Sequence, residues 1–268
     1  MTRDAASLVC TSYESMACAV CPLFFDGVCH NSSVDRGAQG SAVVRRVSVT
    51  KGQRVFDSEL SKNQTFVVRS GILCVQQYTR QGRHHVLSLI LPDEVVGIGR
   101  RQEGLSVAAA TDCVLCKIDL RLLERHLERY SSARRAVYQK QQDQLERLRW
   151  LTWAVGALTP DERVCAFLVQ AIGFMPYQVQ DETSGMLTMR LSRADIADML
   201  CTSVETISRV THKLQEDGIL VILNPEVFLI RDMPGLCRRG RVNVAPRSMT
   251  IFSGGRYCGD GPRPPVGG

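Results

Sequence analysis

The sequence predicts an α+β chain in which an antiparallel β domain comes first, one long helix follows, and a smaller helical domain with a β-hairpin comes last. Three observations predict this order. Residues 41–127 contain short runs rich in Val, Ile and Thr that are separated by turn residues. Residues 128–158 contain no proline and one glycine, as suits a long helix. Residues 159–237 contain capped helical segments followed by two short apolar runs.

The β domain is predicted from the apolar runs and from the gaps between them. Apolar residues dominate AVVRRVSVT, TFVVRSGILCVQQYT, HHVLSLILPDEVVGIG and LSVAAATDCVLCKIDL. Turn-forming pairs such as Lys51-Gly52, Gln81-Gly82 and Pro92-Asp93 separate or interrupt these runs. Runs of this length and spacing predict antiparallel hairpins that close into a sandwich or a small barrel.

The composition is that of a globular protein, with 268 residues of which 44% are hydrophobic and 22% are charged. The N-terminal segment has no apolar run of the kind that a secretory signal needs, and no stretch is apolar enough to cross a bilayer. We therefore expect a cytoplasmic protein with no membrane partner, in which thiols stay reduced. Residues 238–268 hold six arginines and one aspartate, which accounts for +5 of the net charge of +6. We expect this Gly- and Pro-rich tail to be disordered.

The long helix over residues 128–158 carries a stripe of side chains at spacings of three and four, as on one helical face. A stripe that contains a glutamine is typical of the seam between two helices. The flanks Lys140, Asp143 and Arg147, which we expect to be exposed, favour a partner helix. The stripe predicts a homodimer, and the alternative is a helix packed on its own domain. Its members are Val137, Gln141, Leu145, Leu148, Thr152 and Val155.

The C-terminal domain is predicted from helix caps. Thr159-Pro160-Asp161-Glu162 has a capping residue, a proline at the first helical position and a carboxylate three residues after the cap. Further on, LSRADIADMLCTSVETISRVTHKLQEDGIL predicts two helices joined by a tight turn, with Ser192 and Ser203 as caps and Gly218 after the second helix. A hairpin with a turn at Asn224-Pro225 follows and has the position of a wing.

The second of these helices has two different faces. One is expected to pack inward, with Val204, Ile207, Thr211 and Leu214. The opposite face carries Glu205, Ser208, Arg209 and His212. An arginine binds guanine through two hydrogen bonds and a glutamate accepts from cytosine, so this face suits a helix-turn-helix that contacts bases in the major groove. An ordinary amphipathic surface helix is the alternative.

Three cysteines, Cys18, Cys21 and Cys29, give the spacing C-x2-C-x7-C inside the N-terminal segment, residues 1–40. A set of four thiolates suits an iron–sulfur cluster or zinc, so a fourth ligand is needed. The other close pair is Cys113 and Cys116; residues three apart on a strand point to opposite faces, so we expect one of the two to face the site. Zinc is the alternative metal, with His30 as a spare ligand.

The order of a β-roll, one long helix and a winged helix-turn-helix resembles the family of the cyclic-AMP receptor protein (CRP) and the fumarate-nitrate reductase regulator (FNR). The resemblance covers residues 15–237, and IADMLCTSVETISRVTHKLQEDGIL is similar to the family's recognition segment. Val204 and Ser208 stand where the cyclic-AMP branch has Arg and Gly, which points to the FNR branch. The resemblance implies a homodimer that binds double-stranded palindromes like TTGAT-N4-ATCAA and works with RNA polymerase. The contacting residues implied are Glu205, Ser208 and Arg209, with Ser203, Thr206 and His212 beside them.

The resemblance also implies the signal. Cys116 takes the position of the family's remote ligand, so that Cys18, Cys21, Cys29 and Cys116 would hold one iron–sulfur cluster per subunit, expected to be [4Fe-4S]. Oxygen would then weaken the dimer and release DNA. No cyclic nucleotide is expected, because VVGIGRRQEGLSVAAAT has no Arg-Ser or Arg-Thr pair for a cyclic phosphate. A family regulator without a cluster, governed by nitric oxide or redox state or constitutive, and a zinc-stabilised DNA-binding protein are the alternatives.

Other classes of protein fit less well. The chain has no nucleophile–base signature, no phosphate-binding glycine loop and no HExxH motif, so we do not expect an enzyme. An electron-transfer protein could use the same cysteines but would have no need of the VETISR helix.

Overall fold

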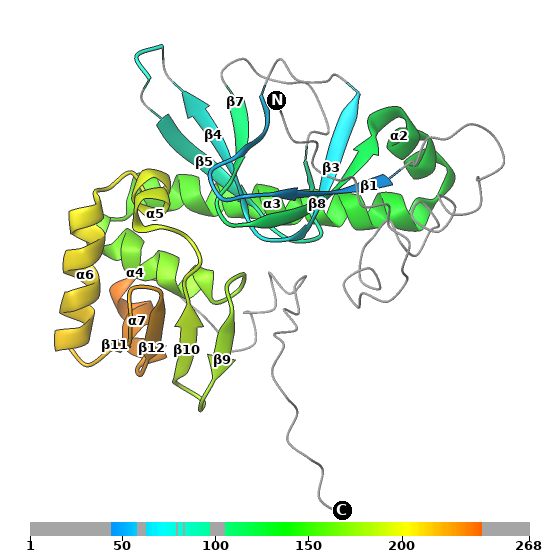
Figure 1. Ribbon diagram of the computed structural model, residues 1–268. Helices are drawn as coiled ribbons and strands as arrows, with labels where there is room; N and C mark the ends of the chain where they lie inside the picture. The colour runs from blue at the N-terminus through cyan, green and yellow to red at the C-terminus, as the bar shows by residue number, and fades with distance from the viewer. Residues whose placement is uncertain (1–43, 58–62, 79, 83, 97–104, 243–268) are drawn as a thin grey trace, which may run out of the picture.

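The computed structural model describes residues 44–57, 63–78, 80–82, 84–96 and 105–242. It has the predicted fold: antiparallel sheets first, a long helix next, and a C-terminal domain with a helix-turn-helix (Figure 1). The N-terminal cysteine segment predicted for residues 1–40 lies outside the described residues.

The N-terminal domain consists of two four-stranded antiparallel sheets, which we call the β-roll. The strand orders are β1-β8-β3-β6 and β2-β7-β4-β5. Buried apolar side chains from both sheets, among them Val68, Leu73, Val107 and Leu115, form the core between the two sheets. The strands are β1 (Val44–Val49), β2 (Arg54–Asp57), β3 (Gln64–Ser70), β4 (Leu73–Tyr78), β5 (His84–Ile90), β6 (Val95–Val96), β7 (Leu105–Ala109) and β8 (Cys113–Asp119).

Two helices follow the β-roll. Helix α2 (Leu120–Arg129) begins at Asp119, whose side chain accepts a hydrogen bond from the backbone N–H of Leu122. Extended backbone at Tyr130 then separates it from α3 (Ser131–Ala157), so the long helix begins three residues later than predicted. Helix α3 runs along the β-roll and links it to the C-terminal domain (Figure 1).

A buried carboxylate attaches α3 to the β-roll. Glu94, in the turn between β5 and β6, accepts hydrogen bonds from the backbone N–H of Leu91 (2.9 Å), from Gln144 Nε2 (2.9 Å) and from Arg147 Nη2 (2.5 Å). The prediction of Arg147 as an exposed flank is therefore wrong. Val137 is also misplaced in the predicted dimer stripe, because only 4% of it is exposed and it packs with β-roll residues.

The C-terminal domain begins with the predicted capping box. The Thr159 N–H donates to Glu162 Oε2 (2.9 Å), and the Glu162 N–H donates to Thr159 Oγ1 (3.4 Å). A four-stranded antiparallel sheet in the order β11-β12-β10-β9 lies beside the helices. The elements are α4 (Pro160–Ala171), β9 (Tyr177–Val179), β10 (Gly185–Thr188), α5 (Arg193–Met199), α6 (Val204–Glu216), β11 (Leu220–Ile222), β12 (Val227–Ile230) and α7 (Met233–Arg239).

The C-terminal domain shares a hydrophobic core with the β-roll sheet that contains β4 and β5. Leu89 of β5 belongs to the same buried cluster as Phe167 of α4 and Met199 of α5. The imidazole Nδ1 of His84 lies 2.7 Å from the Asp198 carboxylate, which adds a polar contact between β5 and α5. The helix-turn-helix is therefore packed against β5, the strand that ends just before the turn at Glu94.

The chain is ordered further toward its C-terminus than predicted. Helix α7 includes Arg238 and Arg239, and Arg239 and Arg241 pair with Asp217 and Glu162. The prediction that the disordered tail begins at residue 238 is therefore wrong, and residues 243–268 lie outside the described part of the chain. None of the described helices combines the length and the apolar character that a membrane crossing needs.

Candidate nucleic-acid interface

The two helices of the helix-turn-helix are α5 and α6, and local hydrogen bonds set where each begins. The Ser192 hydroxyl oxygen accepts the Asp195 N–H (3.0 Å), and the Ser203 oxygen accepts the Thr206 N–H (3.2 Å), as predicted for the two N-caps. The turn between them passes through the positive φ of Cys201 (50°), and α6 is followed by Gly218 with φ 71°.

The two faces of α6 differ from the prediction at one position on the inner side. Ile207, Thr211 and Leu214 are buried as expected, and the Thr211 hydroxyl lies 3.0 Å from the Ile207 carbonyl oxygen, which satisfies this buried polar group. Val204 is instead 39% exposed, and Val210 is buried in its place. Val204 is the first residue of the helix and lies beyond the edge of the core. Val210 lies one turn before Leu214, on the same buried face.

The opposite face is open to solvent. Glu205, Arg209 and His212 are exposed, and Ser208 is half-buried beside them. The backbone N–H of Glu205 itself, and then the Ser203 hydroxyl, lower the pKa of the Glu205 carboxyl below its usual range, so this side chain is ionised at neutral pH.

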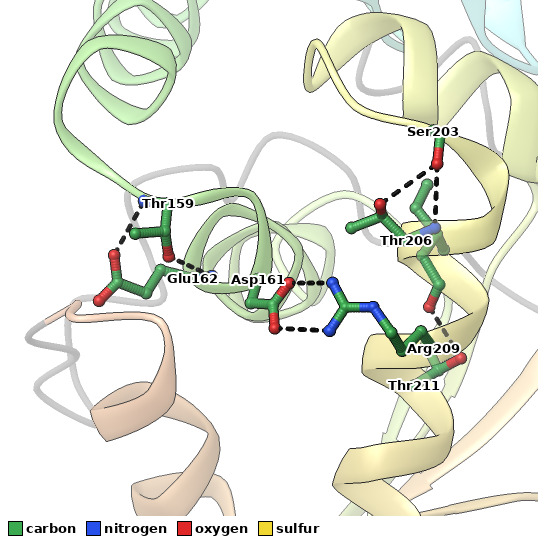
Figure 2. Close-up of polar contacts among 8 residues, drawn as sticks. Thr159, Asp161, Glu162, Ser203, Thr206, Arg209 and Thr211 are labelled. Atoms are coloured by element: carbon green, nitrogen blue, oxygen red, sulfur yellow. Dashed lines mark hydrogen bonds and ion pairs between the residues drawn. The ribbon is translucent and has the colours of Figure 1, made fainter.

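Ser203 and Thr206 take part in the cap of α6. Besides accepting the Thr206 N–H, the Ser203 oxygen lies 3.2 Å from the Thr206 hydroxyl oxygen (Figure 2). Their hydroxyls therefore fix the start of the helix that presents Glu205 and Arg209.

Arg209 is held by a carboxylate from another helix. Its Nη1 donates to Asp161 Oδ2 (3.0 Å) and its Nη2 donates to Asp161 Oδ1 (2.6 Å), as Figure 2 shows. Asp161 lies in the first turn of α4, and sequence reasoning had assigned it only to the start of that helix. The hydrogen bond from Arg209 lowers the pKa of the Asp161 carboxyl, and the same contact raises the pKa of Arg209.

Two further arginines in the domain were missed by sequence reasoning. Arg193, the first residue of α5, donates from Nη1 to the Ser208 hydroxyl oxygen (2.9 Å). Arg163 of α4 donates from Nη1 to the carbonyl oxygen of Leu200 (2.7 Å) and so attaches α4 to the turn between α5 and α6. The partners are 15 and 37 residues apart in the chain, so no local pattern signals either contact.

The wing forms as predicted. Strands β11 and β12 pair antiparallel, with Leu220 opposite Ile230 and Ile222 opposite Phe228. The Asn224 side-chain oxygen accepts the N–H groups of Glu226 and Val227, both at 2.9 Å, which closes the turn at the wing's tip.

Most of the predicted dimer stripe on α3 lies on the open side of that helix. Leu145 and Leu148 are each 38% exposed, Thr152 is exposed, and Gln141 and Val155 are half-buried. Tyr138 and Trp153 add further exposed aromatic surface to the helix. A row of exposed apolar side chains along one helix suits contact with a second helix.

The two cysteines of β8 point to opposite sides of the strand, as the spacing predicts. Cys113 is 3% exposed in the β-roll core, its thiol lies 3.1 Å from the Thr111 carbonyl oxygen, and burial raises its pKa. Cys116 is half-buried and packs against the cluster that contains Val137. Cys18, Cys21 and Cys29 lie outside the described residues; within the part that is described, no three His, Cys, Asp or Glu side chains lie close enough to hold a metal ion.

Comparison with known proteins assigns both domains. Residues 46–130 match the family model of the cyclic nucleotide-binding domain, and residues 162–239 match that of the Crp-like helix-turn-helix domain. A protein of Rhizobium leguminosarum bv. viciae named "Probable transcriptional activator" is 30% identical over 173 residues, which are 64% of this chain and 71% of that protein. The chain belongs to the CRP/FNR family of transcriptional regulators.

Further CRP/FNR relatives are similar to this protein along most of its chain. The transcriptional activator protein FnrL of Cereibacter sphaeroides is 24% identical over 222 residues, which are 82% of this chain and 90% of FnrL. The solved structure of FixK2 from Bradyrhizobium japonicum has a TM-score of 0.65 at 22% identity, over 76% of this chain and 99% of that one. CRP/FNR regulators are DNA-binding dimers and not enzymes, so this chain is a transcription regulator.

Proposed function

We propose that this regulator belongs to the FNR branch, that it binds palindromes like TTGAT-N4-ATCAA as a homodimer under low oxygen, and that oxygen acts through an iron–sulfur cluster. The observation that carries the DNA part is the exposed face of α6, where Glu205, Ser208 and Arg209 lie together on a capped helix. The cysteine pattern carries the oxygen part.

The chemistry of α6 suits the G·C pair of each half-site. A guanidinium donates to the two acceptors on the major-groove edge of guanine, and a carboxylate accepts from cytosine N4. Arg209 and Glu205 are four residues apart and so lie one turn apart on the same helical face. RNA polymerase is the partner that an activator of this family needs.

The homodimer is supported by the open side of α3. Leu145, Leu148 and Thr152 lie along it with Gln141 and Val155, and a second copy of the helix would cover them. Covering apolar surface stabilises association by about 25 cal/mol per Å². A symmetric dimer then presents two copies of α6 to half-sites that lie about one helical turn apart.

The cluster would be held by Cys18, Cys21, Cys29 and Cys116. The described thiols fit this set at one position: Cys116 is half-buried and lies on the side of β8 away from the β-roll core, whereas Cys113 is enclosed by that core. When bound, such a cluster supplies a thiolate-held, redox-active centre. Cys116 packs in the same cluster as Leu123 of α2 and Val137 of α3, so its side chain is in contact with the region where the long helix begins.

The experiment starts from protein purified without oxygen. Iron and sulfide are measured per chain, with about four of each expected for the cubane cluster, and binding to the palindrome is measured by gel shift before and after exposure to air. Cys116→Ser is expected to lose the iron, and Cys113→Ser is the matched control that keeps it. A colourless protein whose binding does not respond to air would remove the oxygen proposal, and a zinc content of one per chain would favour the zinc alternative.

A further inference from the structure

The arginine proposed to contact guanine has a protein partner even without DNA. Arg209 binds Asp161 through both terminal nitrogens, although the two residues are 48 positions apart and belong to different helices. Both side chains are on the surface, with 58% and 42% of each exposed. Arg209 follows Glu205 by one helical turn, so the contact drawn in Figure 2 lies on the exposed face of α6 that also carries Glu205.

The geometry of the contact leaves Arg209 able to bind a base. A guanidinium has five N–H donors in a fixed plane. Asp161 accepts one hydrogen from Nη1 and one from Nη2, so it occupies the end-on edge that these two nitrogens form. The Nε hydrogen and the second hydrogen of Nη2 point along a different edge. Two parallel donors on one edge are what the O6 and N7 acceptors of guanine require. Asp161 and guanine therefore use separate donors of the same side chain.

A fixed partner also reduces the side-chain conformational entropy that Arg209 loses when it binds DNA. An exposed arginine has many rotamers, and ordering it on DNA opposes binding. In the free protein, Asp161 already binds both terminal nitrogens of Arg209, which favours this orientation of the guanidinium. The carboxylate is itself fixed, because it lies in the first turn of α4, where the helix dipole favours an anion. The Arg209 contact keeps the pKa of Asp161 below its usual range, so the pair is intact at neutral pH.

We propose that Asp161 is a positioning residue for base recognition, which holds Arg209 in the orientation that contacts the guanine of each half-site. This inference rests on the proposed palindrome and on the role of Arg209 there. Asp161 adds specificity without touching a base: it acts through Arg209, and its effect is confined to the G·C position.

The test compares two duplexes, TTGAT-N4-ATCAA and the same palindrome with each guanine replaced by adenine and its complement adjusted. Dissociation constants are measured by fluorescence anisotropy at one salt concentration without oxygen, and their ratio is the discrimination at the guanine. For Asp161→Asn, the affinity for the first duplex is expected to fall about three- to fivefold, the size that a well-oriented exposed ion pair supports. The affinity for the second duplex stays within about twofold, so the discrimination falls by nearly the same factor.

Three controls separate positioning from loss of charge or of structure. Asp217→Asn removes a carboxylate from another exposed aspartate–arginine pair, which Asp217 forms with Arg239 at the far end of α6. This variant is expected to leave the discrimination unchanged. Asp161→Glu keeps the charge and is expected to retain most of the discrimination. In an Arg209→Gln background, Asp161→Asn is expected to have no further effect on the ratio, and thermal unfolding confirms that each variant is folded.

The outcomes are distinct. If Asp161→Asn binds the first duplex more tightly, Asp161 competes with DNA for Arg209 and the inference is wrong. An unchanged discrimination ratio also overturns it, while leaving the proposed palindrome intact. If the unmodified protein itself does not distinguish the two duplexes, the proposed role of Arg209 fails, and the positioning role fails with it.

Discussion

Replacing Glu94 with alanine removes the carboxylate that attaches α3 to the β-roll. That carboxylate accepts three hydrogen bonds, from the Leu91 N–H, Gln144 and Arg147, and its side chain is almost fully buried. Arg147 is only 13% exposed, so its guanidinium would lose this carboxylate in a largely buried position. Removing one member of a buried ion pair costs about 3–5 kcal/mol, so we expect Glu94→Ala to lower the free energy of unfolding by about 4 kcal/mol. Glu94→Gln keeps the shape and one acceptor, and about half that loss is expected.

The assay is urea unfolding at one fixed protein concentration, because the stability of a dimer depends on concentration. Glu146→Gln is the matched control: Glu146 pairs with Arg149 on the exposed side of the same helix, and its loss should cost less than about 0.5 kcal/mol. Equal losses for Glu94→Gln and Glu146→Gln would refute the argument, since the structure assigns them very different burial.

Three further predictions concern the dimer, a turn and a cap. Leu148→Asp should raise the dimer dissociation constant more than about a hundredfold, because each of the two copies loses a leucine that the dimer would bury, and each leucine contributes about 1.5–3 kcal/mol. Sedimentation measures the dissociation constant, and Gln139→Asp, outside the stripe, should leave the dimer intact. Gly71→Ala should cost roughly 3 kcal/mol, because φ is 87° and a Cβ there would clash with Asp112 and Cys113, whereas Gly52→Ala, with a similar φ and open space, should cost roughly 1 kcal/mol. Thr159→Ala should cost about 1 kcal/mol in thermal unfolding through loss of the capping box.

The parts of the fold that were predicted correctly depend on neighbours in the sequence. Ser192 and Ser203 each cap a helix by binding an N–H three residues later, and Asn224 closes the wing in the same way. The alternation of Cys113 and Cys116 across β8 follows from the two-residue period of a strand. In each case the physical cause lies within a few residues, so the pattern of residue types is sufficient to find it.

The errors have a common origin in contacts between distant segments. The spacing of Val137 fits the dimer stripe, but the position of α3 on the β-roll decides which side of the helix is covered, and Glu94 fixes that position through Arg147. Arg239 was assigned to a disordered tail because residues 238–268 are rich in glycine and proline, yet it pairs with Asp217 at the C-terminal end of α6. Asp161 has a local role as a first-turn carboxylate, which hides its contact with Arg209.

The position of α3 also has a consequence for how the two domains respond to each other. Gln144 and Arg147 bind Glu94, while Trp150 and Leu151, up to two turns further along, pack against the core that the C-terminal domain shares with β5. Seven residues of helix span about 10 Å, and a helix transmits a displacement over that length with little bending. The position of α3 at the Glu94 turn therefore also sets where Leu151 packs against the cluster that contains residues of α4 and β5. Arg163 of α4 also binds the carbonyl oxygen of Leu200, just before the turn into α6, so α4 connects the contacts of α3 to the start of the helix that carries Arg209.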